Sequence, residues 1–208
     1  MFFRFFQMTE KSEWIPIEDK ANVVAQAKER GAKRLTILAC SDPAPSAETA
    51  NREAIQYKGP LYFDIDCKED LPAAIAACRK LVEKLTDAGV PADCTEVYCS
   101  GSKGMHVIVD ARVFLTGGGT LTLPAIYKEM AVALFVEGLD LGVYSGKTGV
   151  CWRIPNVQRD DGNYRIRITH EELAILDEAT YRALCSAPRE GVEFKEATPI
   201  ISARLQNL

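Results

Sequence analysis

Apolar residues form short uninterrupted runs and helical spacings along the chain, and these patterns predict its strands and helices. Residues 1–6 form a compact apolar run typical of a buried first strand. Residues 17–30 carry apolar side chains at helical spacing, and Gly31 follows at the position of a C-terminal cap. Strands are expected again at 34–40 and 61–66, and a long polar connection separates them.

The second half of the chain alternates helices with strand pairs. Asp70 is a candidate cap, and Pro72 a first-turn residue, of a helix that ends near Gly89. The further expected elements are strands at 97–100 and 105–110 around a glycine turn, a helix at 124–137, a hairpin of 150–154 with 164–168, and short helices from Thr169 and at 178–185. Helices interleaved with hairpins predict a mixed α/β fold of the α+β class.

Composition narrows the class of protein. The chain has 208 residues, 47% of them hydrophobic, which suffices for one domain or for two small lobes sharing a core. A net charge of −4 excludes a protein that coats nucleic acid by bulk electrostatics, although a local basic groove is allowed. The seven cysteines are scattered without a C-x-x-C pair, which indicates reduced thiols in a cytoplasmic protein. No apolar run reaches membrane-spanning length, so no membrane partner is expected.

Two carboxylates, Asp64 and Asp66, close the apolar run at 61–66. Side chains on a strand alternate between faces, so both carboxylates project from one face while Phe63 and Ile65 point to the other. Their mutual repulsion is relieved if a divalent cation lies between them, and hard oxygen ligands suit magnesium or manganese. The alternative is an exposed strand end with two solvated carboxylates.

A second cluster surrounds the glycine turn. Ser100, Lys103 and His106 offer a hydroxyl, an ammonium and an imidazole there, and backbone amides of the turn can face an anion. These groups suit phosphate oxygens. The alternative is a plain hairpin with a surface lysine and a satisfied core histidine.

A third, basic cluster lies between residues 146 and 168. Its members are Lys147, Arg153, Arg159, Arg165 and Arg167, set against Asp160 and Asp161. A solvated charged face is the usual reading of such a run. Arginines on predicted strands can instead aim their guanidinium groups in one direction, which suits a triphosphate or a nucleic-acid backbone.

Taken together, the clusters resemble the motifs of the archaeo-eukaryotic primase superfamily, which includes the primase-polymerases. Tyr62-Phe63-Asp64-Ile65-Asp66 resembles its acidic pair, and Ser100-Gly101-Ser102-Lys103-Gly104-Met105-His106 resembles its serine-glycine turn running into a histidine. Asp140-Leu141-Gly142-Val143-Tyr144 and Cys151-Trp152-Arg153-Ile154-Pro155-Asn156 resemble its third carboxylate and the basic element after it. The chain departs from the family at Ser102, where many members carry a second basic residue, and it has no zinc-binding cysteine cluster.

The resemblance implies roles for particular residues. Asp64, Asp66 and Asp140 would be catalytic and hold two divalent ions, Mg²⁺ or Mn²⁺. Ser100, Lys103, His106 and Arg153 would contact the phosphates of the incoming nucleotide, and Lys147, Asn156 and Arg165 are candidate contacts to nucleotide or template. The implied fold is an α+β catalytic domain over residues 1–187, with an RNA-recognition-like (RRM-like) catalytic sheet, an N-terminal α/β unit and two intertwined lobes. A tail or linker at 188–208 would follow.

The resulting hypothesis is a DNA primase or primase-polymerase. It would transfer nucleotidyl groups from NTPs or dNTPs to make or extend primers on single-stranded DNA, in plasmid or phage replication, with a helicase domain or a replication protein as partner. The alternatives are an end-joining or gap-filling repair polymerase of the same superfamily, a non-catalytic single-strand-binding module for replication initiation, and a D-x-D phosphohydrolase that releases phosphate rather than pyrophosphate.

Overall fold

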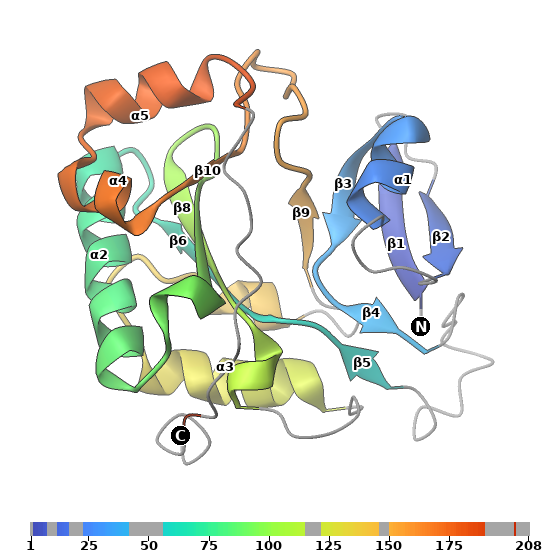
Figure 1. Ribbon diagram of the computed structural model, residues 1–208, viewed down its shortest axis with the longest axis horizontal. Helices are drawn as coiled ribbons and strands as arrows, with labels where there is room; N and C mark the ends of the chain where they lie inside the picture. Colours follow the sequence, from blue (N-terminus) through green and yellow to red (C-terminus); the bar gives the residue numbers. More distant parts are fainter. Residues whose placement is uncertain are drawn as a thin grey trace.

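The fold combines two antiparallel sheets with helices, as Figure 1 shows for the computed structural model. The structure describes residues 2–7, 12–16, 23–41, 56–114, 122–145, 150–189 and 202, the first two ranges by their backbone alone. This part of the chain contains five α-helices and several 3-10 turns between strands. The predicted α+β class is therefore confirmed.

The N-terminal sheet has the strand order β5-β4-β1-β3-β9, with β2 added beside β1. Its strands are β1 (Phe2–Gln7), β2 (Ser12–Pro16), β3 (Ala32–Thr36), β4 (Ala39–Cys40), β5 (Tyr57–Lys58) and β9 (Cys151–Arg153). Helix α1 (Val23–Glu29) packs on this sheet by burying Ala27 against Ala32 and Ile154. Gly31 ends the helix with a φ of 72°, a left-handed conformation that glycine adopts without strain.

The second sheet has four strands in the order β10-β7-β8-β6. They are β10 (Ile166–Ile168), β7 (Thr95–Cys99), β8 (Gly104–Val109) and β6 (Leu61–Asp66). Alternation along these strands gives the sheet two unlike faces. One face buries Phe63, Ile65 and Val107 in the main hydrophobic core. The other carries polar side chains.

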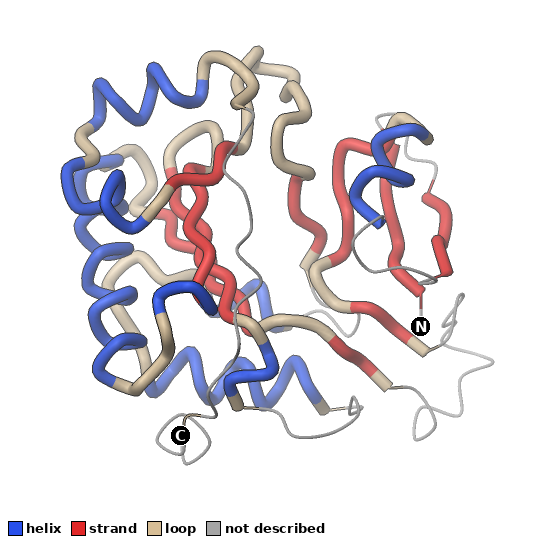
Figure 2. Tube along the Cα trace, viewed as in Figure 1, coloured by secondary structure: helices blue, strands red, loops and turns tan. Residues whose placement is uncertain are grey.

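Helices cover the apolar face of the four-stranded sheet. They are α2 (Leu71–Asp87), α4 (His170–Ile175) and α5 (Glu178–Cys185), and they lie on the side away from the N-terminal sheet (Figures 1 and 2). Asp70 caps α2 by accepting a hydrogen bond from the amide of Ala73, and Thr169 forms a capping box with Glu172 at α4, both as the sequence predicts. Helix α2 also buries an apolar stripe, which includes Leu71, Ile75 and Leu85, in the main hydrophobic core.

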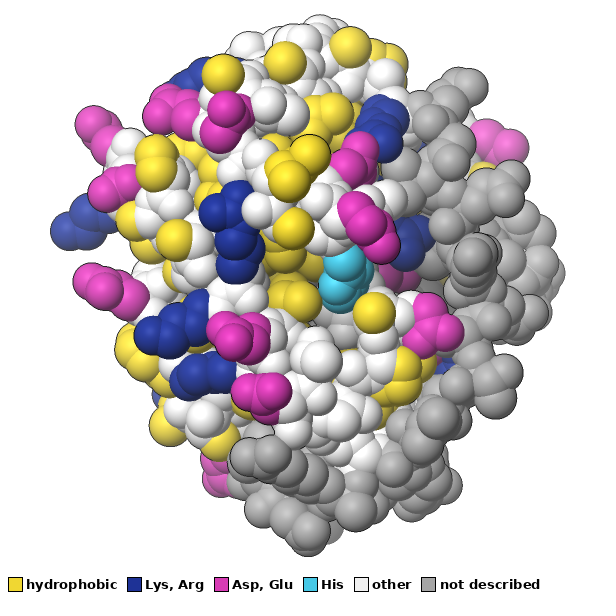
Figure 3. All heavy atoms as spheres, turned by 60° about the vertical axis from the view of Figure 1, so that its left-hand side comes forward, with side chains coloured by type: hydrophobic (Ala, Val, Ile, Leu, Met, Phe, Trp, Pro, Cys, Tyr) yellow, Lys and Arg dark blue, Asp and Glu magenta, His cyan; other side chains and the backbone are white. Residues whose placement is uncertain are grey.

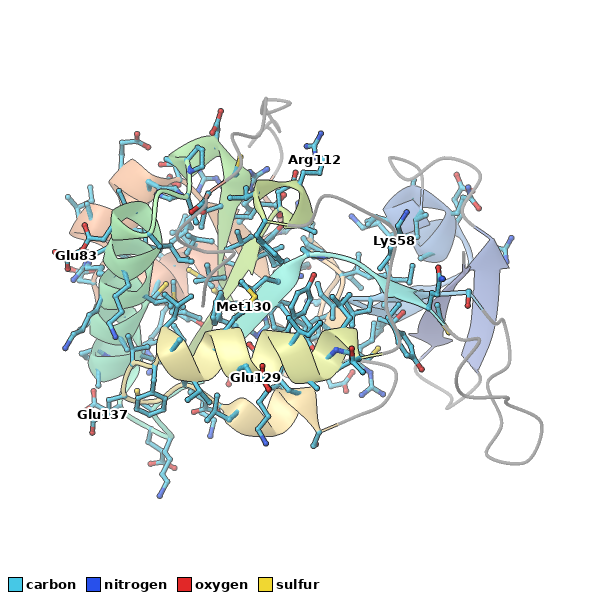
Figure 4. The ribbon with its side chains drawn as sticks, turned by 90° about the horizontal axis from the view of Figure 1, so that it is seen from below. Lys58, Glu83, Arg112, Glu129, Met130 and Glu137 are labelled. Carbon is cyan, nitrogen blue, oxygen red and sulfur yellow. The ribbon has the colours of Figure 1, made fainter. Side chains whose placement is uncertain are left out.

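Helix α3 (Leu123–Ala133) crosses one end of the four-stranded sheet. Seen from below in Figure 4, Met130 lies on the side of α3 that faces the sheet and Glu129 on the opposite side. Met130 is accordingly buried and Glu129 exposed. After α3 the chain turns at Gly138 and enters the 3-10 turn η5 (Leu141–Tyr144).

Three sequence-based expectations about elements need correction. The expected strand at 34–40 is two strands, β3 and β4, and the helix expected at 124–137 ends at Ala133. The expected hairpin of 150–154 with 164–168 is wrong, because β9 pairs with β3 and β10 pairs with β7, in different sheets. Of the other expectations, the start of the helix at 17–30 and most of the connection at 41–58 lie outside the described residues.

The outer surface of the helical side carries acidic and basic side chains interspersed, without a large area of one sign (Figure 3). None of the described helices combines the length and apolar composition that crossing a bilayer requires. Ser202, within the expected tail, is buried and hydrogen-bonds through its amide to the carbonyl of Val113.

Candidate active site on the four-stranded sheet

Polar side chains form a continuous row across the four-stranded sheet. Asp64 on β6 lies opposite His106 on β8, and His106 lies opposite Tyr98 on β7. Tyr98 in turn lies opposite Arg167 on β10. Because directly paired residues share a face, these four side chains and Asp66, two residues along from Asp64, belong to one surface. We call this surface, made by Asp64, Asp66, Tyr98, His106 and Arg167, the polar face.

Asp140 joins the polar face from a segment that runs along the outer edge of β6. Leu139 forms a bridge with Ile65, the amide of Asp66 donates to the carbonyl of Gly138 at 2.9 Å, and the amide of Asp140 donates to the carbonyl of Asp64 at 2.9 Å. Leu139 is buried with Ile65. Its neighbour Asp140 is therefore on the same side as Asp64, and the structure brings the three predicted carboxylates together.

Glycine makes this approach possible. Gly138 has a φ of 84°, and a Cβ atom there would lie 2.3 Å from Sγ of Cys67. A larger residue would be strained at this φ and would have to displace the thiol of Cys67. Gly138 thus favours the turn that leads the chain to Asp140.

Crowding of the carboxylates has an electrostatic consequence at Asp64. Burial, followed by the charges of Asp140 and Asp66, raises the pKa of Asp64 to about 6, while the charge of Arg165 lowers it. Like charges held this close are costly unless a cation compensates them. The site therefore favours a bound cation, or a proton at acid pH.

Within the described ranges, Asp66 and Asp140 each have one carboxylate oxygen that accepts no short hydrogen bond. Oδ1 of Asp66 accepts from the amide of Lys68 at 2.7 Å, and Oδ1 of Asp140 accepts from the amide of Gly142 at 2.7 Å. Oδ2 of Asp66 lies 3.7 Å from Nζ of Lys103, a loose contact between exposed groups. These backbone bonds fix the direction of the carboxylates.

These donors fit a hard divalent cation by chemistry, with three carboxylates on one surface and a like-charge cost at Asp64. Among the described residues, no three ligand groups are already gathered tightly enough to hold a metal ion. Small movements of Asp66 and Asp140 side chains would therefore accompany binding.

His106 is buried and stacks on Trp152 of β9, with ring centroids 4.2 Å apart and planes at 14°. Its Nε2 lies 3.6 Å from Oδ1 of Asp64, and its Nδ1 has no hydrogen-bond partner among the described residues. Burial, then the charges of Arg165 and Arg159, hold the pKa of His106 well below its usual value. The imidazole is therefore neutral at pH 7, and its contact with Asp64 is not an ion pair.

Arg165 lies beneath this stack rather than at the surface. Its guanidinium carbon is 3.9 Å from the ring centroid of Tyr98 and 5.1 Å from that of Trp152, and NH1 donates to the carbonyl of Arg153 at 3.0 Å. Nε and NH2 are buried, and the part of the chain that the structure describes offers them no hydrogen-bond partner. Two aromatic faces and the field of nearby carboxylates compensate the charge of this buried cation.

Ser100 and Lys103 lie at the edge of the polar face, on the turn between β7 and β8. Oγ of Ser100 accepts from the amide of Gly104 at 3.2 Å, and the carbonyl of Ser100 accepts from Arg159 at 3.1 Å. Arg159 therefore reaches this turn from the loop between β9 and β10. The turn, His106 and the carboxylates share one side of the molecule.

Three other residues that the sequence predicts to contact nucleotide or template are not placed with the carboxylates by the structure. Arg153 lies on β9, opposite Arg34 of β3. Burial and then the charge of Arg159 lower the pKa of Arg153, while the charges of Asp161 and Asp160 raise it. The amide side chain of Asn156 is occupied by the backbone of Arg189, with bonds of 2.6 and 2.9 Å. Lys147 lies outside the described residues.

Sequence reasoning missed Tyr98 and Trp152 as parts of the site. Tyr98 could have been found from the sequence, because side chains two residues apart on a strand share a face and Tyr98 is two residues before Ser100. Trp152 had none, because its role depends on β9 belonging to the other sheet. Arg159 was noted for its charge alone, and its bond to Ser100 depends on the fold of the loop.

Comparison by sequence adds no relative. The chain matches no known protein-family model and no curated protein. The function is therefore inferred from the geometry of the polar face and from the resemblance of its motifs to those of the primase superfamily.

Proposed function

We propose that the chain is a metal-dependent nucleotidyltransferase of the archaeo-eukaryotic primase type, which makes or extends primers on single-stranded DNA. The observation that supports this most is the convergence of Asp64, Asp66 and Asp140 on one sheet face, with the Ser100 turn at its edge. A four-stranded antiparallel sheet with helices on one face is compatible with the RNA-recognition-like catalytic half of that superfamily.

In this proposal the carboxylates of Asp64, Asp66 and Asp140 hold two divalent ions, Mg²⁺ or Mn²⁺. When bound, such ions lower the pKa of an attacking 3′-hydroxyl and neutralise charge that develops on the pyrophosphate. The carboxylates must be ionised to bind them, so activity should fall at acid pH.

The residues of the turn would bind the triphosphate. Lys103, 51% exposed at its side chain, can leave its loose contact with Asp66 and turn to a phosphate oxygen. The hydroxyl of Ser100 and the imidazole of His106 would add hydrogen bonds beside it. Arg165 would act from below as a buried positive charge that keeps Asp64 ionised near neutral pH.

The test is nucleotide incorporation on an unprimed single-stranded DNA template, with Mg²⁺ or Mn²⁺, by the wild type and by Asp64→Ala/Asp66→Ala. Asp93→Ala, an exposed carboxylate of the 3-10 turn η3 (Ala92–Cys94), is the matched control. Metal-dependent products and released pyrophosphate from the wild type and the control, absent from the double variant, are expected.

Other outcomes separate the alternatives. Release of inorganic phosphate without products would favour a phosphohydrolase, and activity restricted to gapped duplexes would favour a repair polymerase. Binding of single strands with no incorporation, even on a primed template, would contradict the enzymatic proposal.

A further inference from the structure

Tyr181 of α5 binds the turn between β7 and β8, residues 100–104, which we call the Ser100 turn. Its hydroxyl donates to the carbonyl of Gly104 at 2.8 Å and accepts from the amide of Gly101 at 3.2 Å. The same oxygen lies 3.4 Å from Oγ of Ser100. The side chain is only 1% exposed, so no ligand reaches it directly.

The hydrogen-bonding capacity of this hydroxyl is fully used within the turn. A phenol has one proton and two acceptor positions. The proton goes to Gly104, and the acceptor positions face the amide of Gly101 and the hydroxyl of Ser100. One side chain thus contacts three groups of a single turn. Its removal would take this hydrogen bond from the amide of Gly101 and would leave the carbonyl of Gly104 with its bond from the Ser100 amide at 2.9 Å.

The turn is also fixed on its other side. Gly101 has a φ of 96°, and a Cβ atom there would lie 2.7 Å from the carbonyl oxygen of Tyr164. The backbone at Gly101 is therefore confined between α5 and the loop before β10.

With these groups occupied, the remaining donors of the turn are well defined. The amides of Ser102 and Lys103 have no hydrogen-bond partner within the described part of the chain. The contact between Oγ of Ser100 and the Tyr181 hydroxyl is long, at 3.4 Å. The Ser100 hydroxyl can therefore turn and donate a hydrogen bond to a ligand oxygen, while its Oγ still accepts from the amide of Gly104. Two amides, one hydroxyl and the ammonium of Lys103 are left to face an anion.

We propose that Tyr181 is a positioning residue for nucleotide binding, which acts through Ser100 by fixing the turn so that these four donors face the triphosphate. The inference rests on the proposed nucleotide-binding function of this turn. Through Tyr181, helix α5 would contribute to nucleotide binding, although it lies outside all the motifs found in the sequence.

The test compares Tyr181→Phe with Tyr127→Phe, because each change removes one buried hydroxyl without creating a void. Tyr127 is also fully buried, and its hydroxyl donates to the carbonyl of Gly59 at 2.6 Å, away from the turn. The measurements are the Kd of a fluorescent ATP analogue with Mg²⁺, the Kd of a single-stranded oligonucleotide, and thermal unfolding.

We expect Tyr181→Phe to weaken ATP-analogue binding about five- to ten-fold, the usual effect of an unmade buried hydrogen bond. Oligonucleotide binding and the control variant should change less than about two-fold.

A double-variant cycle with Ser100→Ala separates positioning from general stability. If Tyr181 acts through Ser100, the combined variant should lose little more affinity than either single variant. In steady-state assays, KM for the nucleotide should rise more than kcat falls. Full additivity of the two changes would overturn the inference.

Hydrogen exchange on the wild type supplies a test that needs no variant. The amides of Gly101 and Gly104 should be protected in the free protein, and those of Ser102 and Lys103 should gain protection only when ATP and Mg²⁺ are added. Fast exchange at Gly101 in the free protein would overturn the inference.

If the wild type binds the ATP analogue and Tyr181→Phe binds it equally well, the positioning role is wrong and the proposed function stands. If the wild type binds none, the proposed function fails and the positioning role falls with it.

Discussion

Asp64 and His106 face each other across neighbouring strands, with Oδ1 and Nε2 3.6 Å apart, yet they do not form an ion pair. Burial and neighbouring charge raise the pKa of Asp64 to about 6 and lower the pKa of His106 far below its usual value. At neutral pH a carboxylate therefore faces a neutral imidazole. The charge of Asp64 is therefore not compensated by His106, and of the nearby cations it is Arg165 that lowers the pKa of Asp64.

Asp64→Asn should stabilise the metal-free protein above pH 6. The pKa of Asp64 is raised in the folded state, so the folded state binds the proton more tightly, and the contribution of Asp64 to stability falls as pH rises from about 4 through 6. We expect the variant to gain about 1–2 kcal/mol over the wild type at pH 8 and almost nothing at pH 4. Urea unfolding with a chelator present measures this difference. Asp93→Asn is the control, and an equal gain at both pH values would contradict the argument.

His106 should remain neutral in the folded protein at pH values where an exposed histidine is already protonated, since burial and then the charges of Arg165 and Arg159 hold its pKa well below the usual value. Removal of one charge in Arg165→Met should bring the pKa of His106 upward, toward its usual value. Titration of the imidazole signals by NMR, with His106→Gln to assign them, measures both. A titration midpoint for His106 that does not change in Arg165→Met would show that Arg165 does not control it.

The sequence predicted the individual elements of the site better than their assembly. The D-x-D strand, the Ser-Gly turn and the cap at Asp70 follow from local rules, because alternation, glycine backbone freedom and side-chain capping depend on near neighbours. The separation of β9 from β10 did not follow, because pairing between strands distant in sequence depends on the packing of the whole chain. For the same reason Arg165 looked like a surface contact although it is buried between Tyr98 and Trp152.

Trp152 should be the main connection between the two sheets. It is 5% exposed, stacks on His106 and meets the ring of Tyr62 edge-on at 5.7 Å. Trp152→Ala should cost about 3–5 kcal/mol of unfolding free energy, through lost burial and a cavity. Phe135→Ala is the matched control, since that ring is 49% exposed and should cost less than about 0.5 kcal/mol. Chemical denaturation followed by far-UV circular dichroism compares them, and similar costs for the two variants would contradict this role.

Gly104 should tolerate no side chain, and its replacement tests how closely β6 and β8 must approach beside the carboxylates. Gly104 lies opposite Asp66, and a Cβ atom there would be 2.5 Å from the carbonyl oxygen of Ile65, which belongs to the backbone and cannot turn aside. Gly104→Ala should therefore separate the strands at Asp66 and cost about 1–3 kcal/mol, the usual range for an overpacked position. Gly162→Ala controls for the glycine change itself, because Gly162 has a positive φ of 85° but no atom within 4 Å of the added Cβ.

If the carboxylates act together, nucleotide incorporation by Gly104→Ala should fall well beyond its loss of folded protein, whereas Gly162→Ala should lose only stability. Equal incorporation per folded molecule in the two variants would mean that the spacing of β6 and β8 at Asp66 does not matter for the chemistry.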